Sequence, residues 1–131
     1  LDWRWFDKKF IELIGSRKDV EIQVRSIFLQ GLLLNSSEIW PNEEEGKKYA
    51  DKLDKIMRKL KIRSRLELCI AYVKSIDWIS SFVIGVDDMN HLVEINNLNT
   101  KKVFSDIELG FIFDELEKAP IKLLDPRCWH E

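Results

Sequence analysis

Hydrophobic positions recur along this chain with two different periods. The first set is spaced by three or four residues, as on one face of a helix, and comprises Phe6, Phe10, Leu13 and Ile14. Gly15 follows this set and predicts the end of that helix. Residues 20–24 alternate between apolar and polar side chains, which predicts a strand with one buried face. Residues 79–86 are mostly apolar, as is typical of a strand buried on both faces of a parallel sheet.

Between these strands the pattern predicts two helices. A long helix is expected over about residues 42–60, where the acidic run 43–45 at its start suits the helix dipole. Ser64 and Glu67 have the spacing of a capping box, in which the serine oxygen and the glutamate carboxylate accept from free backbone amides. The helix that follows is expected to turn four apolar residues inward, namely Leu66, Cys69, Ile70 and Val73.

After the second strand two more helices are predicted. Asp88 is expected to cap a helix that runs from Met89 to about residue 98, with Leu92 and Ile95 inward. Ser105 and Glu108 form a second capping-box pattern, before a helix to about residue 118. Strands separated by helices pair in parallel through crossovers. Two such strands leave both sheet edges bare, so the pattern predicts an α/β fold that is a piece of a larger sheet.

Composition and charge restrict the class of protein. The 131 residues are 45% apolar and 34% charged, which fits a single globular segment over residues 1–131. A net charge of -2 gives no general attraction to nucleic acid or to an anionic membrane surface. No apolar stretch is long enough to span a membrane. The two cysteines, Cys69 and Cys128, do not make a disulfide framework, so we expect a soluble, cytoplasmic protein with Cys69 as a buried free thiol.

Several strings in this order resemble the carboxyl-terminal part of bacterial aldo-keto reductases. They are residues 1–5 (LDWRW), residues 24–33 (VRSIFLQGLL), residues 83–88 (VIGVDD) with His91, Leu92 and Glu94, and residues 124–126 (LDP) with Trp129. The resemblance covers essentially the whole chain. It implies the carboxyl-terminal part of a (β/α)₈ TIM barrel, from after the sixth strand to the end. The intact parent would use NADP or NAD to reduce a small aldehyde or ketone, or to oxidise the alcohol. We expect binding of the cofactor by this chain alone to be weak or absent.

The resemblance also implies a cofactor-binding set. By resemblance, the residues that line the cofactor are Ser26, Phe28, Gln30, Gly31, Gly85, Val86, Asp87, Asp88, His91 and Glu94. Such barrels place their active face at the carboxyl ends of the strands and bind phosphate at the loops after the seventh and eighth. Glycine there allows a backbone to approach a diphosphate, and the start of a helix presents free amides to an anion.

The chain departs from the family pattern in three ways. Asp87 and Asp88 stand where a basic residue often contacts the 2′-phosphate of NADP, so both NAD and NADP stay open. Glu94 is followed by Ile95 rather than the usual asparagine. The family's catalytic Asp, Tyr, Lys and His, and the ring under the nicotinamide, come from earlier segments. We therefore predict no catalytic residue in this chain and no carbonyl reduction by it alone, which an assay of NADH- or NADPH-dependent aldehyde reduction tests.

The same sequence raises two alternatives, a metal site and a binding domain. Residues 128–131 hold three possible metal ligands, but adjacent residues at a terminus lack the framework that zinc needs, so we predict no metal site. The alternative function is a non-catalytic binding or assembly domain built from a half-barrel, whose bare strand edges pair with a second copy or another chain. In either case we expect self-association, because a monomer would expose residues such as Val24 and Val83.

Overall fold

The structure is a computed structural model that describes residues 2–35, 40–41, 43–86, 88–98, 102–116 and 118–129. Over these residues the chain is mostly helical and has two parallel strands, as in a partial α/β fold. Its elements, in chain order, are η1 Trp3–Phe6, α1 Lys8–Ser16, β1 Gln23–Val24, η2 Leu32–Leu34, α2 Glu43–Leu60, α3 Arg65–Lys74, β2 Ser81–Phe82, α4 Met89–Asn97, α5 Asp106–Leu116, α6 Ile121–Leu124 and η4 Pro126–Cys128.

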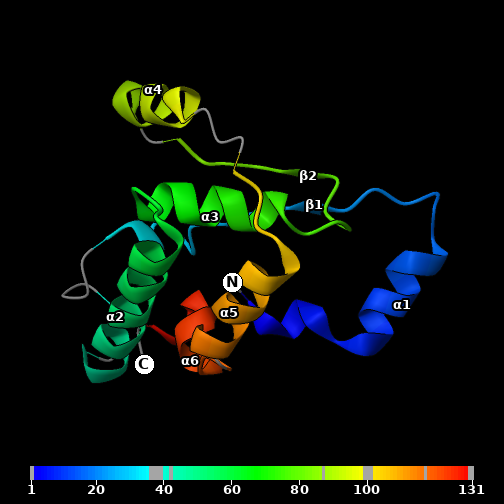
Figure 1. Cartoon of the computed structure of the whole chain (residues 1–131), viewed down its shortest axis with the longest axis horizontal. Coiled ribbons are helices and arrows are strands. Elements are labelled where there is room, and N and C mark those ends of the chain that lie inside the picture. Colours follow the sequence, from blue (N-terminus) through cyan, green and yellow to red (C-terminus); the bar gives the residue numbers. More distant parts are fainter. Residues whose placement is uncertain are drawn as a thin grey trace.

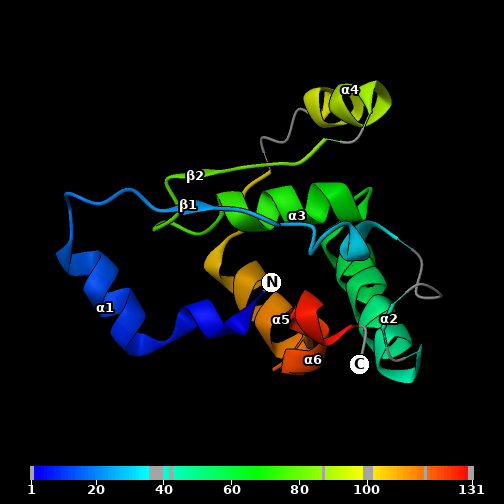
Figure 2. The same cartoon turned by 180° about the vertical axis from the view of Figure 1, so that it is seen from behind.

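The two strands pair in parallel, as predicted. Gln23 lies opposite Ser81 and Val24 lies opposite Phe82. The chain between them forms α2 and α3, and α3 lies along one face of the strand pair in both views (Figure 1, Figure 2). The carboxyl ends of β1 and β2 are therefore neighbours, and the loops that leave them meet at one edge of the sheet.

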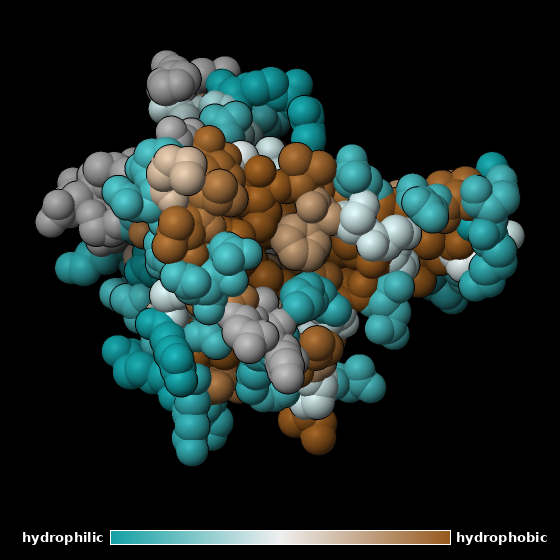
Figure 3. Space-filling view, turned by 90° about the horizontal axis from the view of Figure 1, so that it is seen from above, coloured by the Kyte–Doolittle hydropathy of each residue, from teal (hydrophilic) through white to brown (hydrophobic). Residues whose placement is uncertain are grey.

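The predicted burial of the second strand is wrong. Only residues 81–82 pair within the expected run 79–86, and Val83 and Val86 expose 49% and 41% of their surface. The first strand is also shorter than predicted, since residues 20–22 precede β1 and Val20 is exposed. The physical reason is that α3 covers only one face of the short strand pair. Val83 and Val86 follow the paired residues and remain exposed to solvent. Figure 3 shows a broad hydrophobic area over the middle of the face seen from above.

The first helix also differs from its prediction. The Asp7 side chain accepts hydrogen bonds from the amides of Lys9 and Phe10, so α1 begins after Asp7 and leaves Phe6 in η1. The helix continues through Gly15 to Ser16. Leu13 is 59% exposed, because α1 extends to the side of the molecule and does not pack its whole apolar face (Figure 1).

The long helix and the two capping boxes follow their predictions closely. α2 runs over Glu43–Leu60, and the Ser64 hydroxyl accepts from the Glu67 amide at 3.1 Å. The Glu67 carboxylate accepts from the amide of Arg63, one residue before the expected partner, at 2.8 Å. The pattern at Ser105 gives the full reciprocal pair, with the Ser105 amide donating to the Glu108 carboxylate at 2.9 Å.

The core lies where α2, α3 and α5 meet. The largest fully buried side chains are Ile56, Leu68 and Ile112, one from each of these helices. The four residues of α3 that were predicted to face inward, Leu66, Cys69, Ile70 and Val73, are all buried. Ser75, at the end of α3, forms a hydrogen bond with the segment just before α5. Its hydroxyl accepts from the Phe104 amide at 2.6 Å.

α4 begins at its predicted cap but is less buried than predicted. The Asp88 carboxylate accepts from the His91 amide at 2.9 Å. Ile95 packs against the core as predicted, whereas the prediction for Leu92 is wrong, since it is 44% exposed. Figure 1 shows α4 standing apart from the three central helices, which leaves one of its faces open. None of the helices in the described ranges is both long and apolar enough to span a membrane.

Candidate functional site

The loop that leaves β1 has an uncommon backbone. Four of its residues have positive φ angles: Ser26 (+56°), Leu29 (+50°), Gln30 (+52°) and Gly31 (+83°). Glycine adopts this region freely, but a side chain with a Cβ is strained there. Three strained residues within one short loop persist only where surrounding contacts fix the loop, and such strain concentrates at functional sites.

Contacts from two helices fix this loop. The Asn35 side-chain amide donates to the Gly31 carbonyl at 2.8 Å, and Arg65 donates to the Asn35 carbonyl at 2.7 Å. Arg65, in α3, is held in turn by a 2.8 Å ion pair with Asp54 of α2. The shape of the loop therefore depends on the packing of the helices behind it.

A cleft of about 600 Å³ lies at the carboxyl ends of the two strands. Its walls come from residues 25–35 and from residues 83–85, 88 and 91, segments far apart in sequence, and we call it the outer cleft. It brings together seven of the ten residues predicted to line a cofactor, namely Ser26, Phe28, Gln30, Gly31, Gly85, Asp88 and His91. Val86 and Glu94 are not among its lining residues, and Asp87 lies outside the described residues.

The outer cleft offers charged and unsatisfied polar groups. Arg25 lines it and has no ion pair or hydrogen bond within the described residues. His91 lies with its ring centroid 6.2 Å from that of Phe28, and its Nε2 atom is buried without a hydrogen-bond partner among the same residues. A buried nitrogen without a partner is costly, so this atom favours a bound molecule that supplies one.

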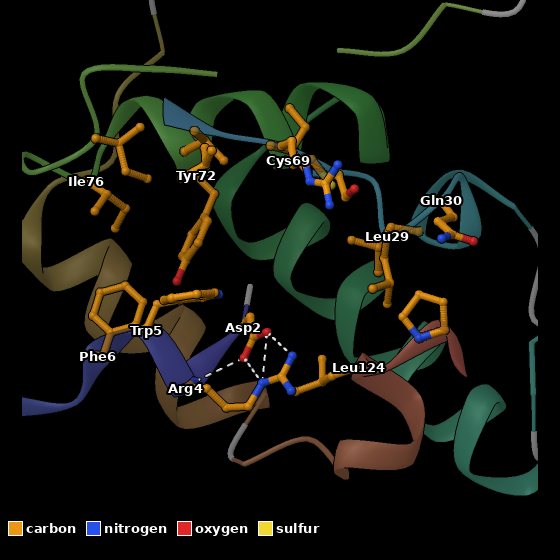
Figure 4. A pocket seen from close by; sticks show the side chains of 18 of the residues that line it. Asp2, Arg4, Trp5, Phe6, Leu29, Gln30, Cys69, Tyr72, Ile76 and Leu124 are labelled. Carbon is orange, nitrogen blue, oxygen red and sulfur yellow. Dashed lines mark hydrogen bonds and ion pairs between the residues drawn. The ribbon is translucent and has the colours of Figure 1, made fainter. Parts of the chain in front are cut away.

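A second cavity, which we call the inner pocket, adjoins the outer cleft. It encloses about 370 Å³ between η1, the β1 loop, α3 and residues 124–126, and Figure 4 shows it from close by. Arg25, Ser26, Ile27 and Gln30 line both cavities. At its floor the Arg4 guanidinium donates to both carboxylate oxygens of Asp2, as the dashed lines in Figure 4 mark.

The sequence did not predict the inner pocket. Its aromatic walls come from Trp5 and Phe6 near the start of the chain, Tyr72 in α3 and Trp78 before β2. The tryptophans are scattered along the sequence, and no local pattern groups Trp5 with Trp78. No spacing pattern shows that residues more than sixty positions apart surround one cavity.

The two cysteines are expected to differ in reactivity. Cys69 lies in the wall of the inner pocket, and burial raises the pKa of its thiol to about 11. At about pH 8 roughly one molecule in a thousand then carries the reactive thiolate at Cys69. Cys128 is a free thiol that is only partly buried. Iodoacetamide should therefore modify Cys128 first, as mass spectrometry of digested protein would measure. In Cys128→Ser the fast reaction should disappear, and a fast reaction that survives would place Cys69 in contact with solvent.

Neither a metal cluster in the described residues nor a known relative identifies this site. Within the described parts of the chain, no group of three or more His, Cys, Asp or Glu side chains is arranged to hold a metal ion. No family model, no curated protein and no solved structure matches this chain. The resemblance to aldo-keto reductases therefore stays a prediction, and the geometry of the two cavities carries the functional argument.

Proposed function

We propose that this chain forms the cofactor-binding wall of an NAD(P)-dependent oxidoreductase of the aldo-keto reductase type. In an intact parent the strands β1 and β2 would be the last two of a (β/α)₈ barrel. The single observation that carries the proposal is the outer cleft. It lies at the carboxyl ends of two parallel strands, which is where such barrels bind phosphate groups, and residues of both loops meet in it.

The arrangement of the strands supports the barrel part of the proposal. The crossover through α2 and α3 leaves α3 on one face of the strand pair. Barrel strands are covered by helices outside and by one another's side chains inside, with neighbours at both edges. The exposure of Val83 and Val86 is consistent with a strand whose further contacts lie in other barrel segments.

The residues of the outer cleft fit the diphosphate part of a dinucleotide. Arg25 supplies a positive charge without a competing partner in the described residues. A side chain added at Gly85 would meet no atom within 4 Å, so the glycine leaves open space for a ligand beside the backbone. The first turn of α4 adds the positive end of a helix dipole.

The cofactor and this chain would have different roles in the reaction. A nicotinamide, when bound, supplies the hydride. The residues of this chain would bind and orient the dinucleotide: Ser26 and Gln30 by hydrogen bonds, Arg25 by charge. Asp88 carries a negative charge beside the cleft, partly compensated by the His91 amide at 2.9 Å. That charge opposes a 2′-phosphate and can accept from a free ribose hydroxyl, so NAD is the better fit.

The test is a calorimetric titration with NAD⁺. We expect weak but saturable binding, and we expect Arg25→Gln to weaken it about ten- to one-hundredfold, because a hydrogen bond to a charged group contributes about 1.5–3 kcal/mol. Arg17→Gln is the matched control. Arg17 is a solvent-exposed arginine that is paired with Asp19 beyond α1, so its loss should leave the affinity unchanged.

A second candidate is favoured by one observation. Val20, Val83 and Val86 expose apolar side chains in and next to the two strand segments. A non-catalytic assembly domain would cover them by pairing a strand edge with a second copy. A dimer in sedimentation equilibrium, with no saturable binding of NAD⁺ at millimolar concentration, would replace the oxidoreductase proposal with this one. A stable monodisperse monomer would count against both half-barrel interpretations.

A further inference from the structure

The hydroxyl of Tyr72 faces the inner pocket, although the residue as a whole is buried. Tyr72 belongs to α3, and only 4% of its surface is exposed. Its ring extends from the helix into the inner pocket, and its oxygen points toward Trp5 (Figure 4). Within the described residues this hydroxyl has no hydrogen-bond partner. The hydroxyl therefore faces the inner pocket as a hydrogen-bond donor without a protein acceptor, and a molecule bound there can accept its proton in place of water.

The walls around this hydroxyl suit an aromatic ring. Trp5 and Trp78 both contact Phe10, with ring centroids 5.4 Å and 5.6 Å apart, and Phe6 lies 6.2 Å from Trp78. These rings and the side chain of Ile76 form an apolar wall. Aromatic rings prefer tilted and edge contacts with further rings. A volume of about 370 Å³ falls within the range of small-molecule sites, roughly 300–1,000 Å³.

The charges near the hydroxyl select a neutral acceptor over an anion. Asp2 lies at the floor of the pocket and is paired with Arg4. Burial raises the pKa of Tyr72, and the negative charge of Asp2 raises it further, so the tyrosine remains a neutral donor. The same burial and the same carboxylate oppose an anionic group beside the hydroxyl. Arg4 and Arg25 act in the opposite direction, because both line the pocket and carry a positive charge that favours an anion.

We propose that the inner pocket is a second binding site, for a small neutral aromatic carbonyl compound of the amide class. The ring lies against Trp5, Phe6 and Trp78, and the carbonyl oxygen accepts a hydrogen bond from the Tyr72 hydroxyl. This site is separate from the proposed dinucleotide site, although the two cavities share one wall. It does not depend on the oxidoreductase proposal, since its recognition groups lie in η1, α3 and the segment before β2.

The experiment is a titration of the full chain with acetanilide, followed by the indole N–H signals in ¹H–¹⁵N spectra. Trp5 and Trp78 line the pocket, while Trp40 and Trp129 do not. We expect saturable shifts of the first two signals alone, with a dissociation constant on the order of 1 mM. Tyr72→Phe removes one oxygen and keeps the ring, and it should weaken binding about three- to tenfold.

Two controls separate the loss of the Tyr72 hydroxyl from a general effect on the fold. Tyr49→Phe alters another buried tyrosine, in α2 and outside the inner pocket, and should leave the affinity for acetanilide unchanged. Thermal unfolding of Tyr72→Phe should match or exceed that of the unaltered chain, because no protein hydrogen bond is lost. The absence of saturable shifts overturns the proposal, as does equal affinity in Tyr72→Phe. Tighter binding of benzoate than of acetanilide also overturns it, because recognition would then be of an anion by Arg25.

Discussion

Replacing Leu68 by alanine is expected to lower the free energy of unfolding by about 3 kcal/mol, since deleting a fully buried leucine removes apolar contacts and leaves a cavity. Leu68 belongs to α3 and has 0% of its surface exposed, where α2, α3 and α5 meet. The other large buried side chains of this core, Ile56 and Ile112, belong to two different helices, α2 and α5, and cannot easily move into the space. Urea denaturation followed by circular dichroism measures the loss.

The matched control is Leu13→Ala, the same deletion at a residue of α1 that is 59% exposed. It should change stability by less than about 0.5 kcal/mol. A loss below about 1 kcal/mol for Leu68→Ala would contradict the packing of α3. It would then also remove the support of both cavities, because α3 contributes Cys69 and Tyr72 to the inner pocket and Arg65 to the contacts that fix the β1 loop.

Local chemistry explains which elements the sequence could predict. The caps at Ser64, Asp88 and Ser105 place their hydrogen bonds within four residues of themselves, so the first turn of each helix is determined by neighbours in the chain. The periodicity of residues 43–60 is likewise a property of one segment. These helices could be located without knowing what they pack against.

Burial could not be predicted in the same way, because it depends on distant segments. The run 79–86 has the composition of a doubly buried strand, yet Val83 and Val86 are open because only α3 covers that strand pair in the described residues. Leu92 has helical spacing with Ile95, but α4 makes so little contact with the other helices that Ile95 is only partly buried and Leu92 is exposed.

The sequence could predict the residues of one cavity but not those of the other. The residues of the outer cleft lie in two short segments next to the parallel strands. The predicted parallel pairing was therefore enough to predict that these segments lie side by side. The inner pocket needs Trp5, Tyr72 and Trp78 to meet, and no rule of local spacing connects the first with the other two. It depends on how η1 returns against α3, which is determined by packing alone.

Gly46 provides the sharpest test of how the start of α2 packs. An alanine methyl at this position would lie 2.6 Å from Cβ of Trp40 and 3.5 Å from the carbonyl oxygen of Pro41. Helix propensity alone favours alanine over glycine by about 1 kcal/mol. Cβ of Trp40 is attached directly to the backbone and cannot rotate away, so we expect a net destabilisation by about 1–2 kcal/mol in Gly46→Ala.

Gly110→Ala is the matched control, because Gly110 lies inside α5 and a methyl there would meet no atom within 4 Å. It should stabilise the chain by about 0.5–1 kcal/mol. The guanidinium carbon of Arg65 lies 6.0 Å from the centre of the Trp40 ring, so a shift of Trp40 would also disturb the contact from Arg65 to Asn35 beside the outer cleft. If thermal unfolding midpoints move in the same direction in the two variants, Trp40 does not pack on Gly46. The β1 loop would then be held by the ion pair of Arg65 without help from the tryptophan.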